Sequence, residues 1–196
     1  MISKTIIAVC YITLQTFVVN PGSQSKQFYD LFLQSKKVSK GQFKGFDVYE
    51  LSDLLIYHGK GKKKRDLHIK HRDIDESLLF FHDTIADARI YHLKFFKSDV
   101  QGLPIVMMLD VESDTSLGQH IFLIKDKKVI YCGFINFAAD DYNFSSLGLH
   151  ARIESVDERI ILSFDTENII DYSMKTLIDG SELRFEIVRG NIIRIQ

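Results

Sequence analysis

Residues 120–137 have the sequence HIFLIKDKKVIYCGFINF, which predicts a β-hairpin that turns at Asp126 and Lys127. Folding the two arms about this turn gives three facing pairs on one side of the hairpin: Ile124 with Val129, Phe122 with Tyr131, and His120 with Gly133. The other side carries Leu123 with Ile130 and Ile121 with Cys132. Both sides are therefore apolar, although an antiparallel hairpin usually exposes one side to water. The sequence thus predicts that further structure, or a bound molecule, covers each side.

The composition of the chain is that of an ordinary globular domain. It has 196 residues, of which 45% are hydrophobic and 26% are charged, which is enough to bury a sizeable core. Phe and Tyr are abundant, with 15 and 8 residues, whereas Pro occurs only 2 times, and this balance favours strands. Because the formal net charge is only -1, we expect no nucleic-acid partner and no general attraction to an anionic membrane.

The first 25 residues have the pattern of a secretory signal peptide. Lys4 precedes an apolar run over residues 5–19, and Ser23 and Ser25 form a small-x-small cleavage site. Cleavage after Ser25 would leave a mature chain that starts at Lys26, in the periplasm or outside the cell. The run is too short and too polar for a membrane span, so we expect no integral span after processing. Residues 26–196 are then expected to form a single β-rich domain.

The alternative is a cytoplasmic protein in which the first residues belong to the core. Thr13, Gln15 and Thr16 dilute the apolar run, which is why this alternative stays open. A lipid anchor at Cys10 is disfavoured, because the apolar stretch that separates it from the preceding positive charge is too short. Cys132 is expected to be a small buried hydrophobe, and no disulfide framework is expected.

The rest of the chain predicts an all-β fold with one short helix. Residues 26–37 place Phe28, Leu31 and Phe32 at helical spacing and end in basic residues, which predicts a short N-terminal amphipathic helix. From Gly45 onward the apolar residues alternate in short segments separated by turns. This pattern is typical of a mainly antiparallel meander that forms a β-sandwich or a half-open barrel.

Three more hairpins follow from this alternation. Residues 51–58 and 67–71 are expected to pair with His58 opposite His68, which would bury Leu55 and Tyr57 and expose both histidines. Residues 149–156 are expected to pair with 159–164. Residues 182–188 are expected to pair with 192–195, with Leu183, Phe185 and Ile187 meeting Ile193 and Ile195.

A basic run lies in the loop of the first of these hairpins. Closely spaced cations can attract a multivalent anion, so the run is a candidate anion-binding loop, made of Lys60, Lys62, Lys63, Lys64 and Arg65. It is not a phosphate-binding P-loop, because no Gly-Lys-Ser or Gly-Lys-Thr ending and no helix follow its glycines. The alternative is a solvated hairpin tip that keeps the sheet soluble.

The histidines and acidic residues do not define a metal or cofactor site. His58 and His68 could face each other, with His71, His82 and His92 on neighbouring strands, but no third and fourth ligand occur at a recognisable spacing. Residues 110–114 carry three alternate acidic groups, yet they lack the glycine and the glutamate of a calcium loop. We therefore predict no metal site and no cofactor.

The apolar hairpin and the export signal together suggest a function. We predict a non-enzymatic, exported β-domain that binds an apolar small molecule or a protein partner, with His120, Phe122 and Tyr131 as the candidate ligand-binding residues. One alternative is a cytoplasmic protein-interaction module, such as a toxin-neutralising partner. The other is a hydrolase whose histidines and carboxylates are brought together by the fold.

Overall fold

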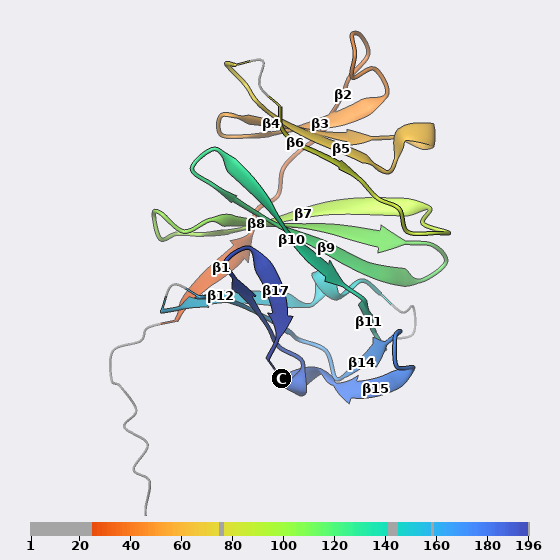
Figure 1. Cartoon of the computed structure of the whole chain (residues 1–196), viewed down its shortest axis with the longest axis vertical. Helices are drawn as coiled ribbons and strands as arrows, with labels where there is room; N and C mark the ends of the chain where they lie inside the picture. Colours follow the sequence, from red (N-terminus) through yellow and green to blue (C-terminus); the bar gives the residue numbers. More distant parts are fainter. Residues whose placement is uncertain (1–24, 75–76, 141–144, 158, 196) are drawn as a thin grey trace, which may run out of the picture.

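The computed structural model describes residues 25–74, 77–140, 145–157 and 159–195. Within these ranges the chain is mostly antiparallel β-structure, which confirms the predicted fold class. The described strands form sheets of nine, five and three strands, and the five-stranded sheet is stacked on one side of the nine-stranded sheet (Figure 1). Cys10 and the predicted signal peptide, except for Ser25, lie outside the described residues.

The nine-stranded sheet curls into a nearly closed barrel. Its strand order is β10 (Lys128–Ile135), β9 (Ser116–Lys125), β8 (Ile105–Glu112), β7 (Ile90–Ser98), β1 (Lys26–Asp30), β12 (Ala151–Val156), β13 (Arg159–Phe164), β16 (Phe185–Val188) and β17 (Asn191–Arg194). All consecutive pairs in this order are antiparallel. The two end strands, β10 and β17, contact each other without a hydrogen-bonded ladder.

The two smaller sheets flank this barrel. The five-stranded sheet contains β2 (Lys36–Lys37), β3 (Phe46–Leu51), β4 (Leu54–Gly59), β5 (Asp66–His71) and β6 (Ser77–His82), in sequence order. The three-stranded sheet contains β11 (Phe137–Ala139), β14 (Asn168–Asp171) and β15 (Thr176–Asp179). Three short 3-10 turns connect strands: η1 (Gly61–Lys63), η2 (Leu147–Leu149) and η3 (Gly180–Glu182).

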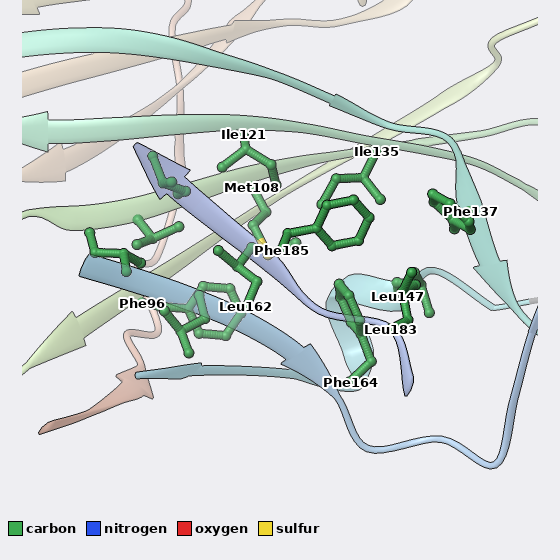
Figure 2. Close-up of a cluster of buried hydrophobic side chains, with 14 of the residues drawn as sticks. Phe96, Met108, Ile121, Ile135, Phe137, Leu147, Leu162, Phe164, Leu183 and Phe185 are labelled. Atoms are coloured by element: carbon green, nitrogen blue, oxygen red, sulfur yellow. The ribbon is translucent and has the colours of Figure 1, made fainter. Parts of the chain in front are cut away.

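Strand β8 shows how the fold buries two separate cores. Met108 points into the barrel core, whereas its neighbours Met107 and Leu109 point into the core beneath the five-stranded sheet. In β9, Ile121 likewise faces the barrel and Phe122 faces the five-stranded sheet. Aromatic and aliphatic side chains from both sides of the barrel fill its interior (Figure 2).

Other strands of the chain pack on both faces of the apolar hairpin of β9 and β10. The barrel strands cover one face, and the five-stranded sheet formed by residues 36–82 covers the other. The cover is incomplete at Ile130 and Tyr131 of the second arm, which are 44% and 40% exposed. The turn also forms as predicted, because Asp126 and Lys127 adopt positive φ angles of 48° and 61°.

The predicted helix at residues 26–37 is wrong. Residues 26–30 form strand β1, which pairs with both β7 and β12, and residues 36–37 form β2. Phe28 is buried in the barrel core, whereas Phe32 is 90% exposed. A five-residue segment gains more backbone hydrogen bonds between two free strand edges than it could form in little more than one helical turn.

Two predicted registers are wrong by one residue. His58 lies opposite Leu67 and His68 lies opposite Tyr57, so His58 is buried and not exposed. A shift of one residue exchanges the two faces of a strand. In the last hairpin Ile193 lies opposite Glu186, on the outer face of the barrel. The hairpin of β12 and β13 forms in the predicted register, with Ile153 opposite Leu162.

The central hairpin is correct near its turn and wrong beyond a bulge. Val129 pairs with Ile124, Ile130 with Leu123 and Tyr131 with Phe122, as predicted. A bulge at Cys132 then shifts the register, so that Ile121 faces Gly133 and His120 faces Phe134. The predicted pairs of Ile121 with Cys132 and His120 with Gly133 do not form.

Candidate functional site

The three predicted ligand-binding residues lie together where the two large sheets meet. Phe81 of β6 packs against all of them, with ring-centroid distances of 4.7 Å to His120, 5.3 Å to Phe122 and 5.2 Å to Tyr131. Phe122 is fully buried and His120 is 5% exposed, whereas Tyr131 is 40% exposed. The phenyl ring of Phe81 therefore occupies the space in which an apolar ligand would contact this hairpin.

A chain of hydrogen bonds runs from the buried interior to the surface at this junction. The Tyr91 hydroxyl donates to Asp83 Oδ2 at 2.5 Å, and His120 Nε2 lies 3.2 Å from Asp83 Oδ1. Because a carboxylate only accepts, Nε2 donates to Asp83, and in the neutral imidazole the Tyr131 hydroxyl, 3.1 Å away, donates to Nδ1. The sequence does not reveal Asp83 and Tyr91 as members of this group, because nothing local marks an aspartate that bonds a histidine 37 positions away.

The order of carboxylate, imidazole and phenol resembles the arrangement of a nucleophilic triad, but the protonation states differ. Burial raises the pKa of Asp83, yet hydrogen bonds from His120, Tyr91 and the Ile85 N–H outweigh it and lower that pKa to about 2. Burial and the Asp83 charge raise the pKa of Tyr131 above its usual range. The exposed phenol is thus kept protonated, the opposite of what an activated nucleophile requires. The chain of hydrogen bonds is suited to joining the sheets.

The other histidine–carboxylate contacts are spread over separate strands. His71 bonds Asp53 at 3.1 Å and His82 bonds Asp66 at 2.6 Å. His92 lies 3.7 Å from Glu112. Within the described ranges, no three or more His, Cys, Asp or Glu side chains gather closely enough to hold a metal ion. The contacts therefore do not assemble one hydrolytic site.

The predicted anion-binding loop folds back onto its own sheet. Lys60 forms an ion pair with Asp47 at 3.3 Å, and the Lys63 ammonium lies 5.4 Å from the centre of the Phe46 ring. The Lys64 ammonium donates to the Arg89 carbonyl at 3.0 Å. Of the remaining predicted residues, Lys62 is exposed and Arg65, which immediately precedes β5, is half-buried. Three of the five cations thus have separate partners within the chain, so they do not converge on one point.

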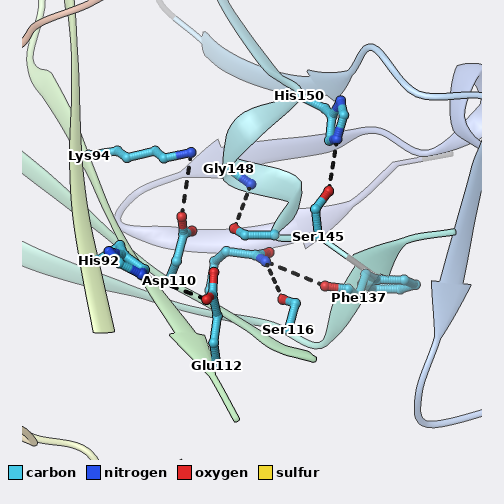
Figure 3. Close-up of polar contacts among 11 residues, drawn as sticks. His92, Lys94, Asp110, Glu112, Ser116, Phe137, Ser145, Gly148 and His150 are labelled. Atoms are coloured by element: carbon cyan, nitrogen blue, oxygen red, sulfur yellow. Dashed lines mark hydrogen bonds and ion pairs between the residues drawn. The ribbon is translucent and has the colours of Figure 1, made fainter. Parts of the chain in front are cut away.

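A second group of polar residues lies at one end of the barrel, next to η2 (Figure 3). Asp110 is 1% exposed, and its Oδ2 lies 3.6 Å from the Lys94 ammonium. Its carboxylate lies against Gly148, where any side chain would collide with Oδ1. Within the described ranges, Asp110 Oδ1 and the Oε1 of Gln119, its partner across the ladder, have no hydrogen-bond partner. Burial raises the pKa of Asp110 to about 6, although the Lys94 charge opposes this.

A third feature is the seam of the barrel, which we define as the facing edges of β10 and β17. Ile130 contacts the Gly190 backbone, and Ile192 contacts the Gly133 backbone. The apolar side chains of Ile130 and Ile193 are 44% and 48% exposed. The seam therefore exposes apolar side chains beside two strand edges that share no hydrogen-bonded ladder.

The surface hollows that we identified among the described residues lie elsewhere, and His120, Phe122 and Tyr131 line none of them. In the part of the chain that the structure describes, no helix is long and apolar enough to cross a membrane. No protein family, curated protein or solved structure matches the chain.

Proposed function

We propose that this protein is a non-enzymatic, exported β-domain that binds a protein partner. One observation carries the choice of a protein over an apolar small molecule. Phe81 fills the face of the central hairpin where a small ligand would lie, while apolar side chains at the barrel seam are exposed. Exposed apolar side chains beside free strand edges are typical of surfaces that bind other proteins.

The protonation of the hydrogen-bonded chain supports a binding role over hydrolysis. Tyr131 is held as a neutral phenol, and His82 and His92 lie on the surface beside single carboxylates. A hydrolase would need a nucleophile or an activated water within reach of a base in one cleft.

The first experiment separates the protein partner from the small molecule. The full chain is purified without denaturation, analysed by native mass spectrometry for bound lipid, and titrated with the apolar dye 8-anilinonaphthalene-1-sulfonate. We expect no bound lipid in the wild type, and stronger dye binding in Phe81→Ala than in the wild type, because the substitution vacates the space beside His120 and Phe122. Lipid bound to the wild-type protein would overturn the proposal in favour of an apolar ligand.

The second experiment addresses the partner and the compartment. The immobilised full chain is incubated with periplasmic and cytoplasmic fractions of its natural host, and any captured protein is then purified and recombined with it. A stoichiometric complex with a periplasmic or secreted protein supports the proposal, whereas a complex with a cytoplasmic protein supports the interaction-module alternative. Sequencing of the natural N-terminus checks export independently: we expect Lys26 as the first residue, and a retained Met1 would contradict export.

A further inference from the structure

We propose that the barrel seam accepts one extended strand from a partner protein, which pairs antiparallel with both β10 and β17 and carries acidic residues at its C-terminal end. This inference rests on the proposed function and specifies its partner. It follows from the direction of the two edges, from the contacts that close the seam, and from the charges at one end of it.

The number of strands determines the direction of the two edges. Nine strands that alternate in direction leave the first and the last strand parallel to each other. The contacts agree, because Ile130 meets Gly190 and Gly133 meets Ile192, with residue numbers rising in the same direction along both strands. One added strand that runs the opposite way would be antiparallel to both edges. It would complete an all-antiparallel barrel of even strand number.

The seam is closed by side chains and not by a backbone ladder. Among the described strands, β10 pairs only with β9, and β17 pairs only with β16. The two edges touch where isoleucine packs on glycine, since a Cβ at Gly133 or at Gly190 would come within 2.7 Å of the facing isoleucine. An entering strand would break these packing contacts and would gain hydrogen bonds from two free edges.

The side chains around the seam indicate the chemistry of that strand. Ile130, Ile193 and Ile195 are each between 44% and 48% exposed, so apolar side chains of the partner would bury them further. Residues on one face of a strand alternate with residues on the other. The partner strand is therefore expected to alternate apolar residues with others.

The charges specify which end of the partner strand is acidic. Lys128 begins β10 and Arg189 lies in the turn before β17, so both cations lie at the same end of the seam. Lys128 also lies opposite Lys125 across the hairpin, and like charges that face each other repel. Within the described part of the chain, neither Lys128 nor Arg189 forms an ion pair with a carboxylate. Because the added strand would run antiparallel to β10, its C-terminal residues would meet these cations.

The test uses two fluorescein-labelled peptides and the full chain. Both peptides alternate threonine and valine, and one ends in two glutamates whereas the other ends in two lysines. Hydrogen exchange should show protection of the amides of β10 and β17 by the glutamate peptide. Fluorescence anisotropy should show that it binds at least about tenfold more tightly than the lysine peptide. In the double variant K128E/R189E the preference should reverse, which also shows that the variant is folded.

A matched pair of single variants tests the position of the site. Ile193→Asp places a charge on the seam and should weaken binding of the glutamate peptide by about tenfold or more. Leu177→Asp is the control, because Leu177 is 63% exposed on β15, at the edge of a different sheet. The control should bind as the wild type does.

Several outcomes would overturn the inference. One is that the glutamate peptide protects amides of β15 or β6 from hydrogen exchange and does not protect those of the seam. The others are equal binding of both peptides and no binding of either peptide. Seam amides that are already protected without peptide in the monomeric full chain would show that the chain itself closes the seam. A dimer that Ile193→Asp dissociates would show that a second copy fills it. If a natural partner binds wild type and Ile193→Asp equally, the seam inference fails while the proposed function stands.

Discussion

Two buried carboxylates, Asp83 and Asp110, lie on opposite faces of the sheet formed by β7, β8 and β9, and each is 1% exposed. Asp83 accepts hydrogen bonds from His120, Tyr91 and a backbone N–H, and these bonds lower its pKa to about 2 in spite of burial. Among the residues that the structure describes, Asp110 Oδ1 has no partner, and burial raises the pKa of Asp110 to about 6 although the Lys94 charge and a hydrogen bond from Ser146 oppose this. The number of donors that reach a buried carboxyl group thus decides which of its forms is stable.

The largest expected effect comes from removing the well-bonded carboxylate. Asp83→Ala leaves the buried His120 and Tyr91 without their shared acceptor, so we expect the free energy of unfolding to fall by about 3–5 kcal/mol. Urea denaturation at pH 7 measures this loss. The control is Asp114→Ala, whose side chain is 85% exposed and paired with Arg89, with an expected change below about 0.5 kcal/mol. Equal losses in the two variants would contradict the role given to Asp83.

A second prediction concerns His58, a buried histidine of β4 that lies on the same side of the β7, β8 and β9 sheet as Asp83. Its Nε2 lies 3.1 Å from the Lys64 carbonyl, and its Nδ1 has no partner in the part of the chain that the structure describes. Burial lowers the pKa of His58 to about 4. The unfolded chain takes up this proton at an ordinary pKa of 6.5, so acidification favours unfolding. We expect His58 to remove about 3 kcal/mol of stability as the pH falls from 6.5 through 4.

The variant His58→Gln keeps a donor for the Lys64 carbonyl and removes this titration. Urea denaturation between pH 7 and pH 4 should show a smaller loss of stability in the variant than in the wild type. The same profile in both proteins would show that His58 does not titrate in this range.

The third prediction concerns Asp110, for which stability should change with pH in the opposite direction to His58. Its pKa is raised above the ordinary value of 3.8, so the folded protein binds this proton more tightly than the unfolded chain does. Asp110 alone should therefore increase stability as the pH falls from 6 to 4, and it partly cancels the effect of His58 in the wild type.

Asp110→Asn removes the buried charge and should raise the free energy of unfolding at pH 7 by about 1–2 kcal/mol. It should also steepen the loss of stability below pH 6, because the His58 effect is no longer opposed. Denaturation curves over the same pH range measure both effects. A variant that is less stable at pH 7 than the wild type would show that the ion pair with Lys94 outweighs the cost of burial.

The sequence predicted which neighbouring segments form hairpins, but it predicted their registers only in part, and it predicted distant pairing poorly. The turn at Asp126 and Lys127 and the pair of Phe122 with Tyr131 follow from alternation within one short segment. The bulge at Cys132 does not follow, because one inserted residue leaves the pattern of apolar letters almost unchanged.

Distant contacts depend on packing that a local pattern does not contain. Strand β1 forms because β7 and β12 offer it two edges, although its own letters also suit a helix. Asp83 follows β6, and its partner His120 lies in β9. Their contact depends on how the five-stranded sheet packs on the nine-stranded sheet, which no local pattern of residues predicts. The anion-binding loop shows the same limit, since the partners of Lys60 and Lys64 lie on other elements.

The smallest expected effect is at the exposed end of the hydrogen-bonded chain. Tyr131→Phe removes the hydroxyl that donates to His120 Nδ1 but keeps the ring that packs on Phe81. Because Tyr131 is 40% exposed, water can reach the vacated position, and we expect a loss of only about 0.5–1 kcal/mol. Urea denaturation at pH 7, with Tyr91→Phe measured beside it, tests this. Tyr91 is 5% exposed and donates to the ionised Asp83, so Tyr91→Phe should lose more stability than Tyr131→Phe. A larger loss in Tyr131→Phe would contradict the conclusion that hydrogen-bond donors keep Asp83 ionised.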